Sequence, residues 1–170
     1  MQPKEMILEL RDNLFGKGYG YLSLSKRSKS NELFCNWLSD SISKLKDEIA
    51  TVKNMVLQAQ MIMVWGDLDK LLISLVNLTN IVNETSFDGS TFFRSSKQVI
   101  EADDKLIRSE FRIVELMKEV LSKVAQFKDC IDSALLTETS QLVFDITELI
   151  DKIINVWKSR TKTILDFKYI

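Results

Sequence analysis

The sequence predicts an all-α protein: an elongated antiparallel helical bundle of about four helices, three of them long, with a short amphipathic helix at the N-terminus. Two observations carry this prediction. The 170 residues include only five glycines and one proline, whereas a strand-rich chain of this length needs many more turns. Apolar residues also recur at alternating steps of three and four over long stretches, which is the spacing of one face of a helix.

The composition is that of a folded chain. Apolar residues make up 45% and charged residues 28% of the sequence, values that exclude a disordered protein. The length favours one compact core. We therefore expect two parts: residues 1–30, a short N-terminal helix followed by a connector rich in Gly, Tyr and basic residues, and residues 31–170, a single helical-bundle domain.

The N-terminal segment begins with an amphipathic helix that carries Met6, Ile7, Leu10 and Leu14, and Gly16 is expected to end it. The glycines of GKGYGY (residues 16–21) do not match a nucleotide-binding loop. The dinucleotide spacing lacks its third glycine, no Gly-Lys-Ser/Thr follows, and a helix rather than a strand precedes. We interpret the segment as a connector that keeps the chain loose before the first long helix.

The first long helix is predicted over about residues 31–65, with Asn31 as its N-cap. The apolar line breaks at Gly66, after which a new stripe runs from Leu68 to Val82. We favour a tight hairpin with Gly66 just past the helix end and Asp67 capping the next helix; one kinked helix is the alternative. The apolar positions of the first line are Cys35, Leu38, Ile42, Leu45, Ile49, Val52, Val56, Ala59 and Met63.

Two further helices are predicted, over about 97–134 and 138–167, separated from the hairpin by an irregular stretch at 84–96. Three phenylalanines of that stretch, Phe87, Phe92 and Phe93, are expected to pack onto the bundle. Thr137 or Thr139 is the candidate cap of the last helix. The third helix has an apolar face wide enough for a bundle interior. That face includes Leu106, Ile107, Phe111, Ile113, Val114, Met117, Val120, Leu121, Val124, Phe127 and Ile131.

Two charged residues fall on apolar lines. Glu110 lies between Leu106 and Ile113, and we expect it at the edge of the face, either reaching solvent or paired with a basic residue. Arg160 stands where the last helix needs an apolar residue, which suggests a seam that is exposed or partnered near its end.

The chain contains no histidine, so the usual general base, the Ser-His and Cys-His couples and the commonest transition-metal ligand are all excluded. We predict no enzyme, no catalytic residue, no cofactor and no metal site. Asp103 with Asp104, and Asp67 with Asp69, are interpreted as acids in the first turns of helices rather than cation ligands.

Two cysteines, Cys35 and Cys130, without a C-x-x-C pair indicate reduced thiols. Together with an N-terminus that lacks a secretory apolar core, they predict a cytoplasmic protein.

The expected function is a non-catalytic interaction or assembly subunit that binds a protein partner, or another copy of itself, through exposed helical seams. The alternative is a helical bundle that associates with an anionic membrane surface or nucleic acid through its basic ends. No small-molecule substrate is expected; a ligand pocket between helices is the remaining class. The candidate contacts to an anionic surface are Lys17, Tyr19, Tyr21, Lys26, Arg27, Lys29, Lys158, Arg160 and Lys162.

Overall fold

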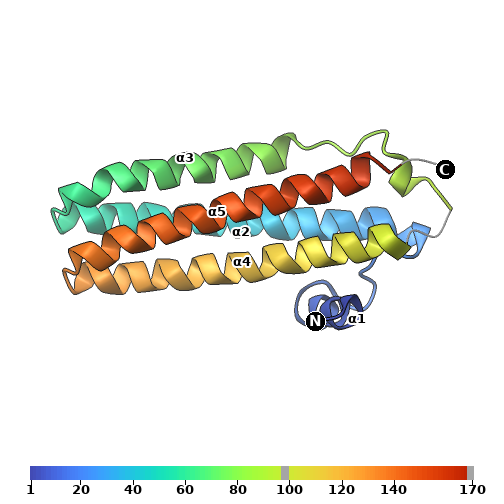
Figure 1. The fold of residues 1–170 in the computed structure, drawn as a ribbon, viewed down its shortest axis with the longest axis horizontal. Helices are drawn as coiled ribbons and strands as arrows, with labels where there is room; N and C mark the ends of the chain where they lie inside the picture. Colours follow the sequence, from blue (N-terminus) through green and yellow to red (C-terminus); the bar gives the residue numbers. More distant parts are fainter. Residues whose placement is uncertain (97–99, 168–170) are drawn as a thin grey trace. The chain divides into compact units, whose positions relative to one another are not determined.

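The structure is a computed structural model that describes residues 1–96 and 100–167, and within these ranges it contains five α-helices and no strand, so the all-α prediction is confirmed (Figure 1). A π-helical turn (η1) follows the first helix and a 3-10 turn (η2) lies between the third and fourth. The elements are α1 (Pro3–Leu10), η1 (Arg11–Phe15), α2 (Leu24–Gln58), α3 (Ile62–Glu84), η2 (Thr91–Phe93), α4 (Ile100–Asp132) and α5 (Leu136–Leu165). The predicted start of the third helix, 97–99, and the basic residue Lys168 lie outside the described residues.

The chain divides into two compact units, each of which we describe by itself. Unit 1 comprises Met1–Leu38, Glu84–Val114 and Asn155–Ile170, and unit 2 comprises Ser39–Asn83 and Glu115–Ile154. α2, α4 and α5 each contribute residues to both units. The boundary predicted after residue 30 falls inside α2, within unit 1.

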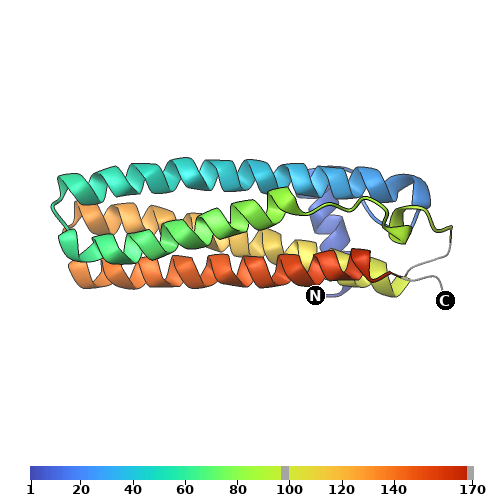
Figure 2. The ribbon, with the colours of Figure 1, turned by 90° about the horizontal axis from the view of Figure 1, so that it is seen from above.

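Unit 2 is made of two helical hairpins, α2–α3 and α4–α5, whose turns lie near each other (Figure 1, Figure 2). Each turn places one non-glycine residue in the left-handed region, Gln60 with φ 56° and Ala134 with φ 57°. The amide of Met61 donates to the carbonyl of Val56 at 3.1 Å. In the same way, the amide of Leu135 donates to the carbonyl of Cys130 at 3.0 Å. Both turns therefore close as Schellman motifs, which satisfy the last carbonyls of the preceding helix.

The hairpin prediction is confirmed, but its predicted position is wrong. The turn lies at residues 59–61, and Gly66 is inside α3 with open space around it. Gln60 takes the left-handed position that we assigned to a glycine. As a result Met63, expected on the inner seam of the first long helix, is instead largely exposed in the first turn of α3.

The core of unit 2 is apolar, and ion pairs at its surface join its helices. Lys123 of α4 pairs with Asp145 of α5 at 2.8 Å, and Lys128 of α4 pairs with Glu48 of α2. The buried side chains follow the predicted stripes, except that Ala59 at the α2–α3 turn and Leu121 of α4 are exposed rather than inside. The buried residues of this core include Ile42, Leu45, Ile49, Val52, Leu68, Leu71, Leu75, Leu78, Met117, Val120, Val124, Phe127, Ile146 and Ile150.

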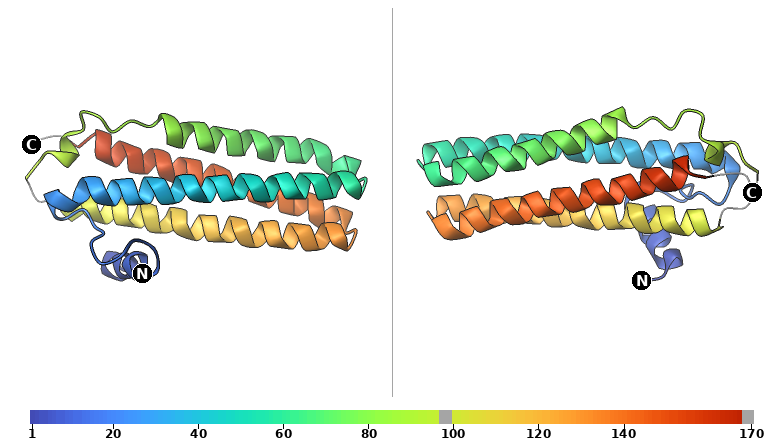
Figure 3. Two further views of the ribbon diagram at one scale, coloured as in Figure 1. Left: turned by 180° about the vertical axis from the view of Figure 1, so that it is seen from behind. Right: turned by 45° about the horizontal axis from the view of Figure 1, so that its top comes forward.

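Unit 1 contains the N-terminal arm, residues 1–23, which loops back before α2 begins (Figure 3). Pro3 occupies the first turn of α1, where its missing amide proton costs no hydrogen bond. Gly16, with φ 80°, ends the π-helical turn as predicted. α2 then begins at Leu24, so the predicted cap Asn31 is an interior helix residue. Its side chain has a different role, described below.

Aromatic side chains fill unit 1. Phe92 of η2 is fully buried and stacks edge-on with Phe93, while Phe87 contacts Phe93 and Trp157. The predicted packing of the Phe-rich stretch is therefore observed within unit 1. The indole nitrogen of Trp157 donates to the Thr85 hydroxyl at 3.2 Å.

The last helix begins slightly earlier than predicted, at Leu136, so Thr137 and Thr139 both lie inside it and neither is its cap. The Thr139 hydroxyl donates back to the carbonyl of Leu135 at 2.5 Å, and the side chain is buried in the first turn. Among the described helices, none combines the length and the apolarity required to cross a lipid bilayer.

Candidate functional site

The most polar buried site of unit 1 is a four-residue group that we call the Glu110 cluster: Tyr19, Tyr21, Glu110 and Arg160. All four side chains are fully buried. Arg160 Nε donates to Glu110 Oε1 at 2.7 Å, and the Tyr21 hydroxyl donates to the same oxygen at 2.5 Å. The Tyr19 hydroxyl donates to Glu110 Oε2. The carboxylate thus accepts three hydrogen bonds, one of them from a cation, which is how a buried acid is stabilised.

Arg160 is held from several sides. Its Nη2 donates to the Asn31 side-chain oxygen at 2.7 Å. The guanidinium carbon lies 4.8 Å from the ring centre of Phe34, 5.1 Å from that of Trp157 and 5.6 Å from that of Phe87. These ring faces attract a cation. Among the described residues Nη1 has no hydrogen-bond partner.

The backbone of GKGYGY explains how two tyrosines reach one carboxylate. Tyr19 and Tyr21 are two residues apart on an irregular segment, so both phenols can project to the same side. Between them Gly20 has φ 140°, and a Cβ there would lie 2.9 Å from Arg11 Nη2 and 3.1 Å from Ile7 Cδ1. The Ser30 hydroxyl accepts from the amide of Gly20 and donates to its carbonyl, each at 2.9 Å. The segment is therefore held by internal contacts within unit 1, and the prediction that it keeps the chain loose is wrong.

Arg27 joins the arm to the Phe-rich stretch. Its Nε donates to the carbonyl of Tyr21 at 2.7 Å, and its Nη1 donates to the carbonyls of Phe92 and Ser95 at 2.9 and 2.8 Å. The amide of Tyr21 in turn donates to the Asp103 carboxylate at 2.9 Å. A buried arginine that bonds carbonyls in this way supports loop backbone that no helix satisfies.

Burial shifts the titration of the cluster. It raises the pKa of Glu110 to about 7, against the lowering effects of the Arg160 charge and hydrogen bond. Burial likewise raises the pKa of Tyr21 to about 12. For Arg160, burial lowers the pKa, but the nearby charges of Glu110 and Tyr21 outweigh it, so the net pKa is raised. Arg160 therefore stays charged while Glu110 titrates near neutrality.

Four of the nine predicted surface contacts are enclosed in unit 1: Tyr19, Tyr21, Arg27 and Arg160. Their polar groups are directed to internal partners, so in this structure they do not present a surface to an anion. The other five predicted contacts are exposed, and their role stays a prediction. These are Lys17, Lys26, Lys29, Lys158 and Lys162.

The sequence identifies Glu110 and Arg160 as two separate charges on apolar lines, but it does not predict that they pair with each other. The expectation that Glu110 pairs with a basic residue is correct, whereas its expected place at a solvent edge is wrong, because the carboxylate is fully buried. The pair could have been predicted from one feature of the sequence: two residues of opposite charge each interrupt an apolar line. None of the three described hollows is lined by Glu110 or Arg160.

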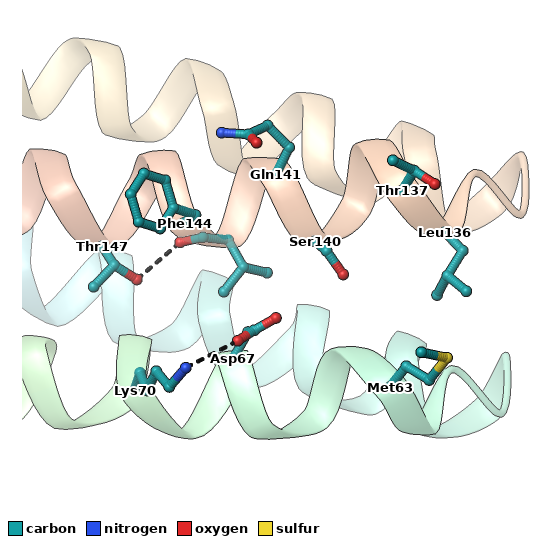
Figure 4. A pocket seen from close by; sticks show the side chains of 10 residues that line it. Met63, Asp67, Lys70, Leu136, Thr137, Ser140, Gln141, Phe144 and Thr147 are labelled. Carbon is teal, nitrogen blue, oxygen red and sulfur yellow. Dashed lines mark hydrogen bonds and ion pairs between the residues drawn. The ribbon is translucent and has the colours of Figure 1, made fainter.

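Unit 2 offers a different kind of site, an open groove between α3 and α5 with a volume of about 740 Å³ (Figure 4). Met63 and Leu136 face each other where the helices begin, and Phe144 lies on α5 toward the other end, beside Thr147. The Lys70 ammonium and the Asp67 carboxylate form an ion pair of 3.3 Å along the α3 side. We call this the α3/α5 groove; its lining residues are Met63, Asp67, Lys70, Leu136, Thr137, Ser140, Gln141, Val143, Phe144 and Thr147.

The apolar surface continues around the α2–α3 turn of unit 2. A smaller hollow of about 210 Å³ is formed there by six residues. They are Val56, Leu57, Gln60, Met61, Ile62 and Trp65.

Comparison of the chain with protein-family models, with curated proteins and with solved structures finds no match in any of the three.

Proposed function

We propose that the protein is a non-catalytic, cytoplasmic interaction or assembly subunit that binds a protein partner through unit 2. The observation that carries the proposal is the exposure of large apolar side chains beside the α3/α5 groove: Ile62 is 82%, Met63 78% and Phe144 63% exposed. Clustered apolar exposure of this kind, rimmed by polar groups, is typical of interaction surfaces.

The composition of α3 supports the same role. No residue from 71 to 83 is charged, although Ile73 and Val76 in this stretch face solvent. The centres of protein interfaces are depleted of charge in this way. A helix that only covered a core would carry charged residues on its outer face.

The proposal is tested by substituting a charge into the exposed surface. Because Met63 and Phe144 are exposed, Met63→Glu with Phe144→Glu should leave folding intact and remove partner binding. A photoreactive side chain at position 144 identifies the partner in extract of the source cells, and the partner is then purified and titrated with the wild-type chain and the double variant.

The matched control is Leu22→Glu, which changes an exposed leucine of unit 1 and should bind like the wild type. If the purified partner binds the double variant as tightly as the wild type, the proposal is wrong. It is also wrong if no partner is captured and sedimentation shows a monomer at all concentrations.

A second candidate function rests on the charge of unit 1. Its residues include 15 Lys and Arg against 11 Asp and Glu, and five of the predicted lysines are exposed. Such a surface could attract anionic lipid or nucleic acid, although each exposed lysine contributes only about 1 kcal/mol near an anionic surface. Reversing Lys17, Lys26 and Lys29 to Glu should abolish binding to anionic vesicles; no binding by the wild type excludes this candidate.

A further inference from the structure

Charge is distributed very unevenly along the part of unit 2 that forms the groove. From Asp129 to Asp151 the chain carries six acidic residues and no basic one. This stretch covers the α4–α5 turn and the α5 side of the groove. Unit 2 as a whole holds 13 acidic against 8 basic residues. The acidic residues of the stretch are Asp129, Asp132, Glu138, Asp145, Glu148 and Asp151.

Several of these acids lack a cation of their own. Asp145 is neutralised by Lys123 and Glu148 by Lys152, at 2.8 Å each. Among the residues that the structure describes, no basic side chain pairs with Asp132, Glu138 or Asp151. Three carboxylates of the acidic stretch are therefore available to a cationic partner: Asp132 and Glu138 beside the α4–α5 turn, where the groove begins, and Asp151 further along α5.

The acids also continue the line of the apolar anchor. Phe144, Glu148 and Asp151 are spaced at i, i+4 and i+7, so they share one face of α5. Asp151 accepts a hydrogen bond of 3.1 Å from the Ser74 hydroxyl of α3, which places it at the junction of the two helices. An occupant of the groove that extends past Phe144 therefore meets the carboxylate of Asp151 on the same face of α5.

We propose, on the basis of the function proposed above, that the α3/α5 groove binds an amphipathic helix of a partner protein whose apolar stripe is flanked by lysines or arginines. The groove residues of α5, from Leu136 to Thr147, span roughly 17 Å at about 1.5 Å per residue, which fits three turns of helix. Apolar anchors at i, i+3 or i+4 and i+7 would contact Met63, Leu136 and Phe144. The flanking cations would face the unpaired carboxylates.

The experiment uses the full chain and three synthetic 18-residue peptides labelled with a fluorophore. The first has leucines at helical spacing with lysines on both flanks, the second replaces every lysine with glutamate, and the third scrambles the first so that no apolar stripe forms. Fluorescence anisotropy at low salt should show that the basic amphipathic peptide binds at least tenfold more tightly than either other peptide. Its affinity should fall as salt rises.

Variants of the chain distinguish binding in the groove from nonspecific attraction of the basic peptide to acidic residues elsewhere. Phe144→Glu should abolish binding of the basic peptide. Asp132→Asn with Glu138→Gln should weaken it by roughly twofold to thirtyfold, since two exposed ion pairs with the peptide are lost. The control Asp12→Asn with Asp88→Asn removes two exposed acids of unit 1 and should leave the affinity unchanged.

The outcomes distinguish this inference from the proposed function. If the acidic peptide binds as tightly as the basic one and Phe144→Glu abolishes both, the groove is an interaction site but its preference for a basic helix is wrong. If the chain itself dimerises and Phe144→Glu abolishes the dimer, a second copy is the occupant and the inference is also overturned. If no peptide binds, the inference fails, while the capture of a partner still tests the function independently.

Discussion

The two units bury their polar groups to very different extents. Of the eight polar or charged residues that are buried in the described part of the chain, seven belong to unit 1, and only Thr139 belongs to unit 2. All the described contacts between aromatic rings also lie in unit 1. The seven buried polar residues of unit 1 are Arg27, Ser30, Ser90, Ser95, Asp103, Glu110 and Arg160.

Unit 2 shows the opposite arrangement, with a core that is aliphatic except for Phe127 and that encloses one polar side chain. A buried polar network requires each member to find its partner, so it favours one arrangement of the chain over others. An aliphatic core accepts many arrangements of similar volume. We infer that unit 1 uses polar contacts to fix its irregular arm and loop, and that unit 2, whose turns are short, needs no such network.

The largest effect is expected from a substitution that breaks the Glu110 cluster. Arg160→Met leaves Glu110 buried without its cation, and we expect a loss of about 3–5 kcal/mol in the free energy of unfolding. Urea denaturation at pH 7, followed by circular dichroism, measures the loss. Lys123→Met, which breaks the partly exposed Lys123–Asp145 pair of unit 2, should cost only a small fraction of this. Equal losses would mean that the two units do not differ in their dependence on ion pairs.

The second prediction concerns pH. Glu110 has a pKa of about 7 in the folded chain, above the value of about 4.3 for an unfolded glutamate. The folded state therefore holds a proton that the unfolded state releases, and the stabilisation present below about pH 4 is lost as the pH rises through 7. We expect the free energy of unfolding to fall by on the order of 2–3 kcal/mol between pH 5 and 8.

Two variants test whether Glu110 is the group that causes this pH dependence. The chain has no histidine, so few other groups titrate in the window. Glu110→Gln should remove most of the slope, although it lowers stability overall. Asp103, whose pKa burial also raises, is checked with Asp103→Asn, which should keep most of the slope. A slope that survives in Glu110→Gln would show that Glu110 is not the titrating group.

The smallest effects come from two glycines and should have opposite signs. Gly20→Ala in unit 1 forces a Cβ into contact with Arg11 and Ile7 at a φ of 140°, and we expect a loss of about 1–3 kcal/mol. Gly66→Ala in α3 of unit 2 meets open space and should gain about 0.5–1 kcal/mol. Thermal unfolding of both variants measures the difference. Gly18→Ala, which also meets open space, is the control; a similar loss in Gly18→Ala would exclude close packing as the cause.

The sequence predicted the helices well because each long helix repeats its apolar spacing over many turns. It misplaced the α2–α3 turn because the rule that a glycine ends a helix was applied to Gly66, while Gln60 adopts the left-handed conformation. A non-glycine residue in this conformation costs roughly 1–2 kcal/mol, which the closing hydrogen bonds and packing of unit 2 offset. Local propensity does not report this compensation.

The candidate sites were less predictable. Glu110 and Arg160 were each recognised as interruptions of an apolar line, yet they are 50 residues apart, and Tyr19 lies 91 residues before Glu110. The exposed apolar surface around Met63 was missed because the heptad pattern assigned that residue to a core. Because the turn lies at residues 59–61, Met63 belongs to α3 instead of α2, and its side chain faces solvent.

The sequence by itself determined the fold class, the approximate lengths of the helices and the absence of histidine chemistry, because these depend on composition and on spacing along one helix. Only the tertiary structure decided what GKGYGY does and where apolar surface remains exposed. Both depend on which segments distant in the chain come into contact. In unit 1 those contacts enclose two tyrosines around one carboxylate, and in unit 2 they leave large apolar side chains exposed beside the α3/α5 groove.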